Sequence, residues 1–483
     1  MNKKRFIIFI FLNLFAFLII YIALFYYQLG ANVKSDSWID PVYQIKDKKA
    51  LNIGDKNKII IVSGSNSLFG INSEKISEIT NKPVLNLAVQ GSLDTDFLYY
   101  KIKKYIKPND IIVMPLEYAH YTRSGYSDWF VNNILVWGND YFYNLNIYNK
   151  IKFIFNINVD RLMLGVKTKF NDEVYQSPEN VIKELAKIID NEGEKWRGYN
   201  YKSLNFDGDI NADEVLDLNY VKLDSPSNLI PSNYFLNVYH KILTLVEKNN
   251  GKLILTHPVT SKHDSYDLTN LKFQKELDDF FTQMIKYGLK IECNPALFHL
   301  NEKFVFNGSY HPNKYGALIR SENLGYCINE LIKNQNFSIS YKEALELTSK
   351  LELKYDGFVK KSNYIKRLED LNNLKIALEN YYKDNGKYPI SQGFDGLYSK
   401  YGYSGNDWIK DLIPKYINKL PIDPRNTNDP SLQYLYKSNG KDYKLISHSP
   451  EDCKSVEKIN KDFIDPSRKC WAYGLWTERA KDW

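Results

Sequence analysis

A long apolar run near the N-terminus constrains this chain more than any other feature. Residues 6–27 are apolar except for Asn13, its only strongly polar member. At about 1.5 Å per helical residue the run spans roughly 33 Å, enough to cross the hydrocarbon core of a bilayer. Lys3, Lys4 and Arg5 precede it, and such a basic head stays in the cytoplasm. The sequence therefore predicts a single-pass protein of the cell membrane, with its bulk extracytoplasmic.

A cleaved signal peptide is the alternative interpretation of this run. Its apolar region normally has about 7–15 residues and ends at a small-x-small cleavage site. This run is longer and ends Phe25-Tyr26-Tyr27-Gln28-Leu29, which is a poor cleavage site. Tyr26 and Tyr27 fit the aromatic belt of a membrane interface. We therefore expect residues 1–28 to form a cytoplasmic head and an uncleaved transmembrane anchor.

The composition indicates folded domains after the anchor. A chain of 483 residues with 44% hydrophobic residues is expected to form two or three domains with real cores. The net charge of +7 is mild for this length and no long basic block occurs, so nucleic acid is not an expected partner. The 38 tyrosines suit contacts with sugars or proteins, and they also pack cores.

The four cysteines all follow the anchor. An even number in an exported chain permits disulfides. Cys453 and Cys470 lie close together in a loop-rich tail, which makes them the more credible pair. Cys293 and Cys327 either pair or remain two buried thiols.

Residues 50–335 alternate between strand and helix patterns. Strands are predicted at 58–62, 83–87, 111–114, 252–256 and near 289–293, and helices at 72–80, 94–106, 234–248 and 314–333. This alternation predicts an α/β domain with a parallel sheet and helices on its faces. Residues 121–230, rich in Asn, Asp and Tyr, look like a less regular insertion with its own helix near 178–192.

Three polar segments of this domain are candidates for chemistry. Ser65 lies in a Ser-Gly-Ser-Asn segment at the carboxyl end of the first strand, where active sites of parallel sheets lie. His311 lies in a polar loop before the last helix and is able to accept a proton from a serine. Gly91 follows the second strand and offers a bare backbone N–H to an oxyanion. Alone, each has a structural alternative: a linking turn, a surface histidine and a simple turn.

Together these segments resemble the SGNH (GDSL-like) hydrolase superfamily, in particular its membrane-associated polysaccharide acyltransferase and esterase branch. The likeness covers about residues 50–335 and is carried by Ser63–Ile71, by Asn86–Gly91 with Ile111–Tyr118, and by Phe306–Gly316. It implies a three-layer α/β/α flavodoxin-like fold. It further implies that Ser65 is the nucleophile, that His311 is the general base, and that the N–H groups of Ser65 and Gly91 form part of the oxyanion hole.

The chain departs from the family pattern at two places. The family usually has an aspartate shortly before the histidine, where this chain has Asn307, which orients an imidazole without stabilising its charge. The usual Gly-x-Asn-Asp block is Pro-Leu-Glu-Tyr here, and Glu117 does not donate to an oxyanion while ionised. Glu117, His120 and His257 either bind substrate or are structural. No His, Cys or Asp spacing is typical of a zinc site, so no cofactor is expected.

The tail after residue 336 has a different character. A helix is predicted at 340–385, followed by the segments Tyr388-Pro389, Leu420–Arg425 and Gly440–Leu445. This order resembles the globular half of a type II secretion pseudopilin or type IV pilin-like protein over about residues 355–483. The resemblance implies an α+β pilin-like domain and an interaction role, with a secretion or glycan-assembly complex as the partner. A pilin begins with a hydrophobic assembly helix, which this domain lacks, so filament formation is not implied.

The same resemblance bears on the last loop of the chain. It implies that Cys453 and Cys470 clip this loop. Relatives of the fold bind calcium there, and Glu451, Asp452 and Asp462 offer carboxylates without a spacing that predicts a site.

Two functions of different class follow from the sequence. The first is a membrane-anchored serine esterase or O-acyltransferase that acts on cell-envelope glycan, with the insertion at 121–230 shaping a carbohydrate cleft. The second is a catalytically weakened glycan-binding or interaction protein whose pilin-like tail docks on a secretion or surface-assembly complex. A hydrogen bond between Ser65 Oγ and a His311 nitrogen, with the Gly91 N–H facing the same space, favours the first.

Overall fold

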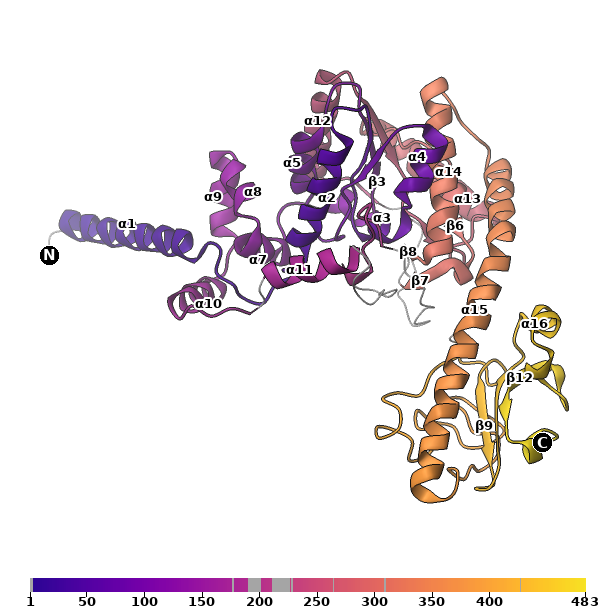
Figure 1. Cartoon of the computed structure of the whole chain (residues 1–483). Helices are drawn as coiled ribbons and strands as arrows, with labels where there is room; N and C mark the ends of the chain where they lie inside the picture. Colours follow the sequence, from indigo (N-terminus) through magenta and orange to yellow (C-terminus); the bar gives the residue numbers. More distant parts are fainter. Residues whose placement is uncertain are drawn as a thin grey trace. The chain divides into compact units, whose positions relative to one another are not determined.

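The computed structural model describes residues 3–175, 178–189, 201–210, 226, 229–263, 265–307, 310–425 and 427–483 (Figure 1). They form two compact units. Unit 1 contains the described residues up to 300 together with residues 310–348, and unit 2 contains residues 301–307 and 349–483. The boundary at 348/349 falls inside one long helix, α15 (Tyr341–Asn385).

A four-stranded parallel sheet forms the centre of unit 1. Its order is β2 (Val84–Asn86), β1 (Ile59–Ile61), β3 (Ile111–Pro115) and β4 (Lys252–Thr256). β1, β2 and β3 are buried along their whole length, as expected for β-branched runs covered on both faces. The prediction of a parallel α/β domain is confirmed. The strand expected near 289–293 is reduced to an isolated parallel bridge between Leu255 and Ile291.

Helices cover both faces of this sheet. Figure 1 shows α2 (Ile39–Ile53), α5 (Thr95–Tyr105) and α12 (Asn233–Lys248) on one side, and α4 (Ser73–Thr80) and α14 (Lys314–Lys333) on the other. Unit 1 also contains α3 (Ser65–Gly70), α13 (Leu271–Lys286), β5 (Thr260–Ser261), β6 (His299–Leu300) and β8 (His311–Pro312). The bounds of α14 are those expected, while α2 and α13 were not predicted.

The described part of the insertion consists mostly of helices, one of them where a helix was predicted near 178–192, so the segment is more regular than expected. It contains α6 (Ala119–Thr122), α7 (Asp128–Trp137), α8 (Asn139–Asn144), α9 (Ile147–Phe155), α10 (Val159–Phe170) and α11 (Pro178–Ile189). The polar residues that suggested loops are N-caps. Asn146 accepts a hydrogen bond from the Asn149 N–H, and Asn158 accepts one from the Arg161 N–H.

One described helix is long and apolar enough to cross a membrane, α1 (Lys3–Gln28). Its side chains are exposed from Lys3 to Ile20, whereas Phe25 and Gln28 near its end are fully buried in unit 1. The end of the apolar helix is therefore part of the folded domain, which favours retention over cleavage.

Unit 2 packs α15 against an antiparallel sheet. The strand order is β11 (Ile464–Asp465), β12 (Lys469–Trp476), β10 (Tyr443–His448) and β9 (Tyr434–Ser438), and α16 (Cys453–Ile459) lies beside β12. β7 (Val305–Asn307) also belongs to this unit. Leu371, Leu374 and Leu378 of α15 are fully buried, so this face of the predicted helix packs in the core of unit 2. The structure pairs Cys453 with Cys470, and in unit 1 it pairs Cys293 with Cys327.

Candidate functional site at the edge of the parallel sheet

Ser65 and His311 meet although 246 positions separate them in the sequence. Ser65 begins α3 directly after β1, and His311 begins β8 directly before α14. The Ser65 Oγ and the His311 Nε2 lie 2.8 Å apart, which is hydrogen-bonding distance. Phe69 packs against the imidazole, with ring centroids 4.8 Å apart. Both Ser65 and His311 are partly exposed residues.

Two glycines surround the Ser65 backbone. A Cβ added to Gly91 would lie 3.5 Å from the Ser65 Oγ and 4.0 Å from the Ser65 backbone nitrogen. A Cβ added to Gly64 would lie 2.4 Å from the Gly91 Cα, which real atoms do not tolerate. Within the described ranges, neither the Ser65 N–H nor the Gly91 N–H donates to a protein acceptor. Two N–H groups without a protein acceptor therefore belong to the residues around this hydroxyl, and backbone N–H groups of this kind are the donors that oxyanion holes use.

Glu117 organises the turn that carries Ser65. It follows β3 and is 5% exposed. Its carboxylate accepts hydrogen bonds from the Gly64 N–H at 3.2 Å, from the Asn66 N–H at 3.0 Å and from the Ser63 hydroxyl at 3.2 Å. The carboxylate therefore fixes the turn mainly through two backbone N–H donors, because the single Ser63 proton is shared with the Pro115 backbone oxygen at 2.6 Å.

The carboxyl group of Glu117 is ionised. Burial acts to raise its pKa, but the positive charge of His120, where that ring is protonated, and the hydrogen bonds from Asn66 outweigh burial and lower it. Burial also lowers the pKa of His120 to about 4, so this ring is neutral near pH 7. The N–H and O–H donors of the turn then keep Glu117 anionic.

A buried arginine that sequence reasoning missed supports the same turn. Arg320 of α14 is fully buried and donates to the Asn66 backbone oxygen at 2.6 Å and to the Asn66 side-chain oxygen at 2.7 Å. The Asn66 amide in turn donates to the Ser63 hydroxyl at 2.7 Å. Burial lowers the pKa of Arg320 to about 9, which leaves it cationic at neutral pH. The sequence signal for this role is a charged residue inside the last helix. The sequence does not show what Arg320 contacts, because Asn66 lies 254 positions away.

Arg123 fixes the loop that carries Gly91, and sequence reasoning missed it too. Its guanidinium donates to the backbone oxygens of Gly91 and Leu93. The following residues Ser124 and Gly125 line an open groove of about 720 Å³. The other lining residues are mostly tyrosines, asparagines and lysines: Asp96, Tyr126, Asn146, Tyr148, Asn149, Lys152, Asn156, Tyr234, Asn237, Val238 and Lys241.

The remaining predicted site residues lie apart from the hydroxyl. The His120 Nδ1 lies 3.4 Å from a Glu117 oxygen, and both side chains are buried, which matches their structural alternative. His257 is 2% exposed and packs on the Phe281 ring at 5.0 Å. Burial lowers the pKa of His257 to about 3, so it is a neutral core residue. Asn307 belongs to β7, and its side chain lies outside the described part of the structure.

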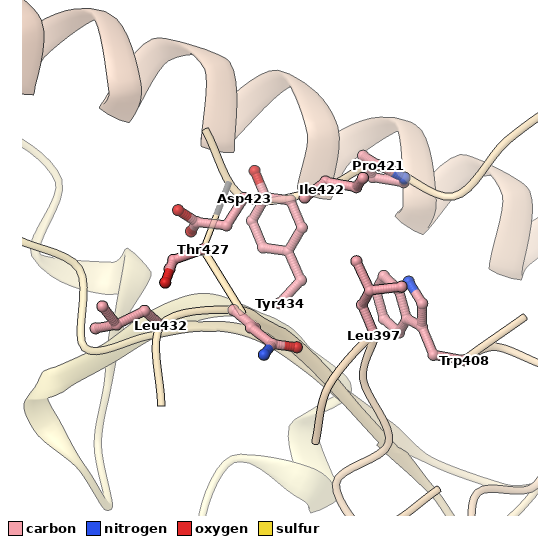
Figure 2. A pocket seen from close by; sticks show the side chains of 9 residues that line it. Leu397, Trp408, Pro421, Ile422, Asp423, Thr427, Leu432 and Tyr434 are labelled. Carbon is pink, nitrogen blue, oxygen red and sulfur yellow. The ribbon is translucent and has the colours of Figure 1, made fainter. Parts of the chain in front are cut away.

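Unit 2 contains a small pocket beside the Leu420–Arg425 segment. Figure 2 shows Leu397 and Trp408 on one side of it and Asp423, Thr427 and Tyr434 on the other. Its volume is about 10 Å³, room for about one water molecule, so it does not hold a ligand.

A network of buried charges lies next to this pocket. The fully buried Arg367 guanidinium contacts Asp423 at 2.9 Å, Glu451 at 2.7 Å and Asp452 at 3.2 Å. Burial acts to raise the pKa of Asp423, but Arg367 and Arg425 outweigh it and hold the pKa at about 2. Two of the three carboxylates considered for calcium are thus bound to Arg367. Among the described residues no three His, Cys, Asp or Glu side chains are placed to hold a metal ion.

Comparisons with known proteins identify one part of the chain. No curated protein matches the sequence. Residues 356–465 match the family model of the type II secretion system (T2SS), protein G. This range lies within unit 2 and covers less than half of the chain. The prediction for the tail is confirmed: the C-terminal domain is similar to the pseudopilin protein G of type II secretion systems.

Proposed function

We propose that unit 1 is a serine esterase or O-acyltransferase that acts on cell-envelope glycan outside the cytoplasm. The observation that carries this proposal is the 2.8 Å contact between the Ser65 Oγ and the His311 Nε2, with two bare N–H groups beside the hydroxyl. A hydroxyl hydrogen-bonded to an imidazole is the minimal arrangement for nucleophilic acyl transfer.

The topology of unit 1 supports an SGNH-like, flavodoxin-like assignment. The sheet order β2-β1-β3-β4, followed by the bridge to Ile291, is that of a doubly wound sheet. The connections leaving β1 and β3 run in opposite directions, which makes a switch point at their carboxyl ends. Ligands of open α/β sheets bind at this point. Ser65 follows β1 and Glu117 follows β3, so the candidate site lies there.

The proposed reaction has two stages. His311 Nε2 takes the Ser65 proton while the Ser65 oxygen attacks the ester carbonyl carbon, and the N–H groups of Ser65 and Gly91 bind the resulting oxyanion. Collapse breaks the bond to the leaving alcohol, whose oxygen takes the proton from His311, and leaves an acyl-Ser65 ester. Water, in an esterase, or a sugar hydroxyl, in a transferase, then gives its proton to His311 and attacks the acyl carbon. This releases Ser65, which recovers its proton from His311.

The proposed compartment rests on three features. α1 is able to cross a membrane, its basic head precedes it, and both pairs of cysteines form disulfides, which persist in oxidising compartments. We therefore propose an inner-membrane anchor with units 1 and 2 outside the cytoplasm.

The open groove is the proposed acceptor site. Amide groups and tyrosine rings suit hydroxyl-rich ligands, because rings cover sugar faces and amides both donate and accept hydrogen bonds. The groove and the Gly91 loop share the segment that begins at Arg123. A glycan in this groove would thus lie against the segment that positions the oxyanion donors.

The test is hydrolysis of an aryl acetate by the full chain in detergent. Ser65→Ala is expected to lower kcat/KM by about 10³-fold or more, whereas Ser338→Ala, at an exposed serine of unit 1, is expected to have no effect. A covalent serine probe should label the wild type at Ser65. Equal inactivity of wild type and Ser65→Ala, with Ser65 unlabelled, would refute the enzymatic proposal.

The second candidate is a non-catalytic interaction protein, which the protein G match favours. In this case unit 1 binds glycan in the groove and unit 2 docks on a secretion or surface-assembly complex. Glycan binding that is equal in wild type and Ser65→Ala, without turnover in either, would support it.

A further inference from the structure

The part of α1 left outside the fold is too short to cross a bilayer by itself. The exposed apolar side chains run from Phe6 to Ile20, which is about 22 Å of helix. The hydrocarbon core of a bilayer is about 30 Å thick. The missing 8 Å or so corresponds to five or six further residues, which are Tyr21 to Tyr26. A membrane crossed by α1 therefore reaches the part of α1 that is packed into unit 1.

This part of α1 is surrounded by α8, α9 and α10 (Figure 1). The Tyr21 hydroxyl donates to the Ile154 backbone oxygen at 2.8 Å, and the Tyr21 ring stacks on Phe155 with centroids 5.8 Å apart. Phe25 packs on Phe142 of α8 at 5.4 Å. α10 crosses α1 at Gly165, where an added Cβ would lie 2.6 Å from the Gln28 side-chain oxygen. These helices are therefore fixed at the depth where α1 leaves the bilayer.

Both α9 and α10 carry exposed apolar stripes. Ile147, Ile151 and Phe155 recur every four residues on α9 and are 74%, 49% and 58% exposed. On α10 the exposed apolar side chains are Val159, Met163, Leu164 and Phe170. A soluble surface rarely exposes so many large apolar side chains together, and such a patch marks an interaction or membrane surface.

The charge of the same segment fits a lipid surface. Residues 147–170 contain the basic residues Lys150, Lys152, Arg161, Lys167 and Lys169 against the single acid Asp160, a net charge of +4. An apolar stripe flanked by lysines is typical of helices that lie in the headgroup and acyl boundary of a bilayer.

We propose that the α9–α10 surface, defined by the exposed stripes on these two helices, is embedded in the non-cytoplasmic leaflet of the membrane that α1 crosses. We assign lipid to this surface for two reasons. α1 packs directly against these helices, and its exposed apolar part is too short to cross the bilayer unless the membrane reaches them. The surface would hold unit 1 against the membrane at a fixed depth. This proposal goes beyond the catalytic one and does not depend on Ser65.

The test measures the depth of single labels in the full chain. The four native cysteines are disulfide-bonded in the structure, so an added cysteine carries the environment-sensitive fluorophore NBD alone. Ile151→Cys and Met163→Cys probe the two stripes, and Lys272→Cys on α13 is the exposed control away from them. Each is placed in nanodiscs of phosphatidylcholine and phosphatidylglycerol, with or without bromine on the acyl chains near the headgroup.

Bromine is expected to quench more than half of the emission at positions 151 and 163 and none at 272. Equal, unquenched emission at all three positions would overturn the proposal. Blue-shifted emission at 151 and 163 that bromine leaves unchanged would overturn it as well, because a protein would then cover the surface. Equal melting temperatures of the three variants establish that labelling leaves the fold intact. The Ser65→Ala background is expected to give the same result.

Discussion

Both units bury a carboxylate completely, but they use it differently. In unit 1, Glu117 accepts hydrogen bonds from neutral N–H and O–H groups of a turn that also carries the partly exposed Ser65. In unit 2, Asp423 is bound directly to Arg367, and the surrounding side chains leave room for about one water molecule. The first arrangement fixes a turn next to a partly exposed serine, and the second joins buried charges to one another inside unit 2. The two buried carboxylates therefore differ in what they hold in place: a partly exposed side chain in unit 1 and other buried charges in unit 2.

The largest expected effect breaks the network in unit 2. Arg367→Met leaves Asp423, Glu451 and Asp452 without their common cation and is expected to destabilise unit 2 by about 3–5 kcal/mol. Hydrogen exchange of the β10 amides measures this loss, and Arg479→Met, at an exposed arginine of unit 2, serves as the matched control. If the hydrogen exchange of the β10 amides is as slow in Arg367→Met as in the wild type, the network does not stabilise unit 2.

Acid is expected to weaken the same network at a pH set by Asp423. Because its pKa is lowered to about 2 in the folded state, its stabilisation is complete above the unfolded value of about 4. The stabilisation is lost as the pH falls from about 4 towards 2, and amounts to about 2–3 kcal/mol. Denaturant unfolding followed at several pH values measures the slope.

Asp423→Asn should flatten this acid-dependent loss. Asp462→Asn, at an exposed aspartate of the same unit, should leave the slope as in the wild type. A slope in Asp423→Asn equal to that of the wild type would assign the acid sensitivity to other carboxylates.

A smaller effect is expected from Glu117→Gln in unit 1. The amide oxygen replaces only one carboxylate oxygen, and the amide N–H₂ opposes the donors of the turn, at a cost of about 1–3 kcal/mol. We expect kcat for aryl acetate to fall about 10- to 100-fold with KM nearly unchanged, since the group positions Ser65 without touching substrate. Glu247→Gln on the exposed face of α12 is the control. Full activity in Glu117→Gln would show that the turn holds its shape without the carboxylate.

Local patterns predicted the parallel sheet and its last helix well. β1, β3 and β4 are β-branched runs that end at turn residues, and α14 begins at Asn313, which accepts hydrogen bonds from the Tyr315 and Gly316 N–H groups. Apart from α11, which lies where a helix was predicted, the helices of the insertion were missed because a segment rich in Asn, Asp and Tyr was interpreted as less regular. Two of its asparagines, Asn146 and Asn158, cap α9 and α10. In a sequence, an asparagine that caps a helix is distinguished from one in a loop only by the helical spacing of the apolar residues that follow it.

The candidate site could be predicted only in part from the sequence, and the reason is a different one. Ser65, Gly91 and His311 follow or precede regular elements, so their shared sheet edge is predictable from order alone. The partners of the turn are not, because Arg320 reaches Asn66 from a helix 254 positions away and Glu117 reaches it across 51 positions. The SGNH-like pattern that the sequence resembles also has a donor where Glu117 stands, whereas in the structure this carboxylate accepts hydrogen bonds from the turn.

The close approach of Gly64, Gly91 and Glu117 has a consequence for the evolution of this chain. A Cβ at position 64 would meet the Gly91 Cα at 2.4 Å and a Glu117 oxygen at 2.5 Å, so the three positions are sterically coupled. In descendants and relatives that keep the turn, they should vary together or not at all. An alignment of close homologues is therefore expected to show positions 64, 91 and 117 either unchanged or changed together, and relatives that have lost this triplet are expected to have lost the geometry of the serine turn as well.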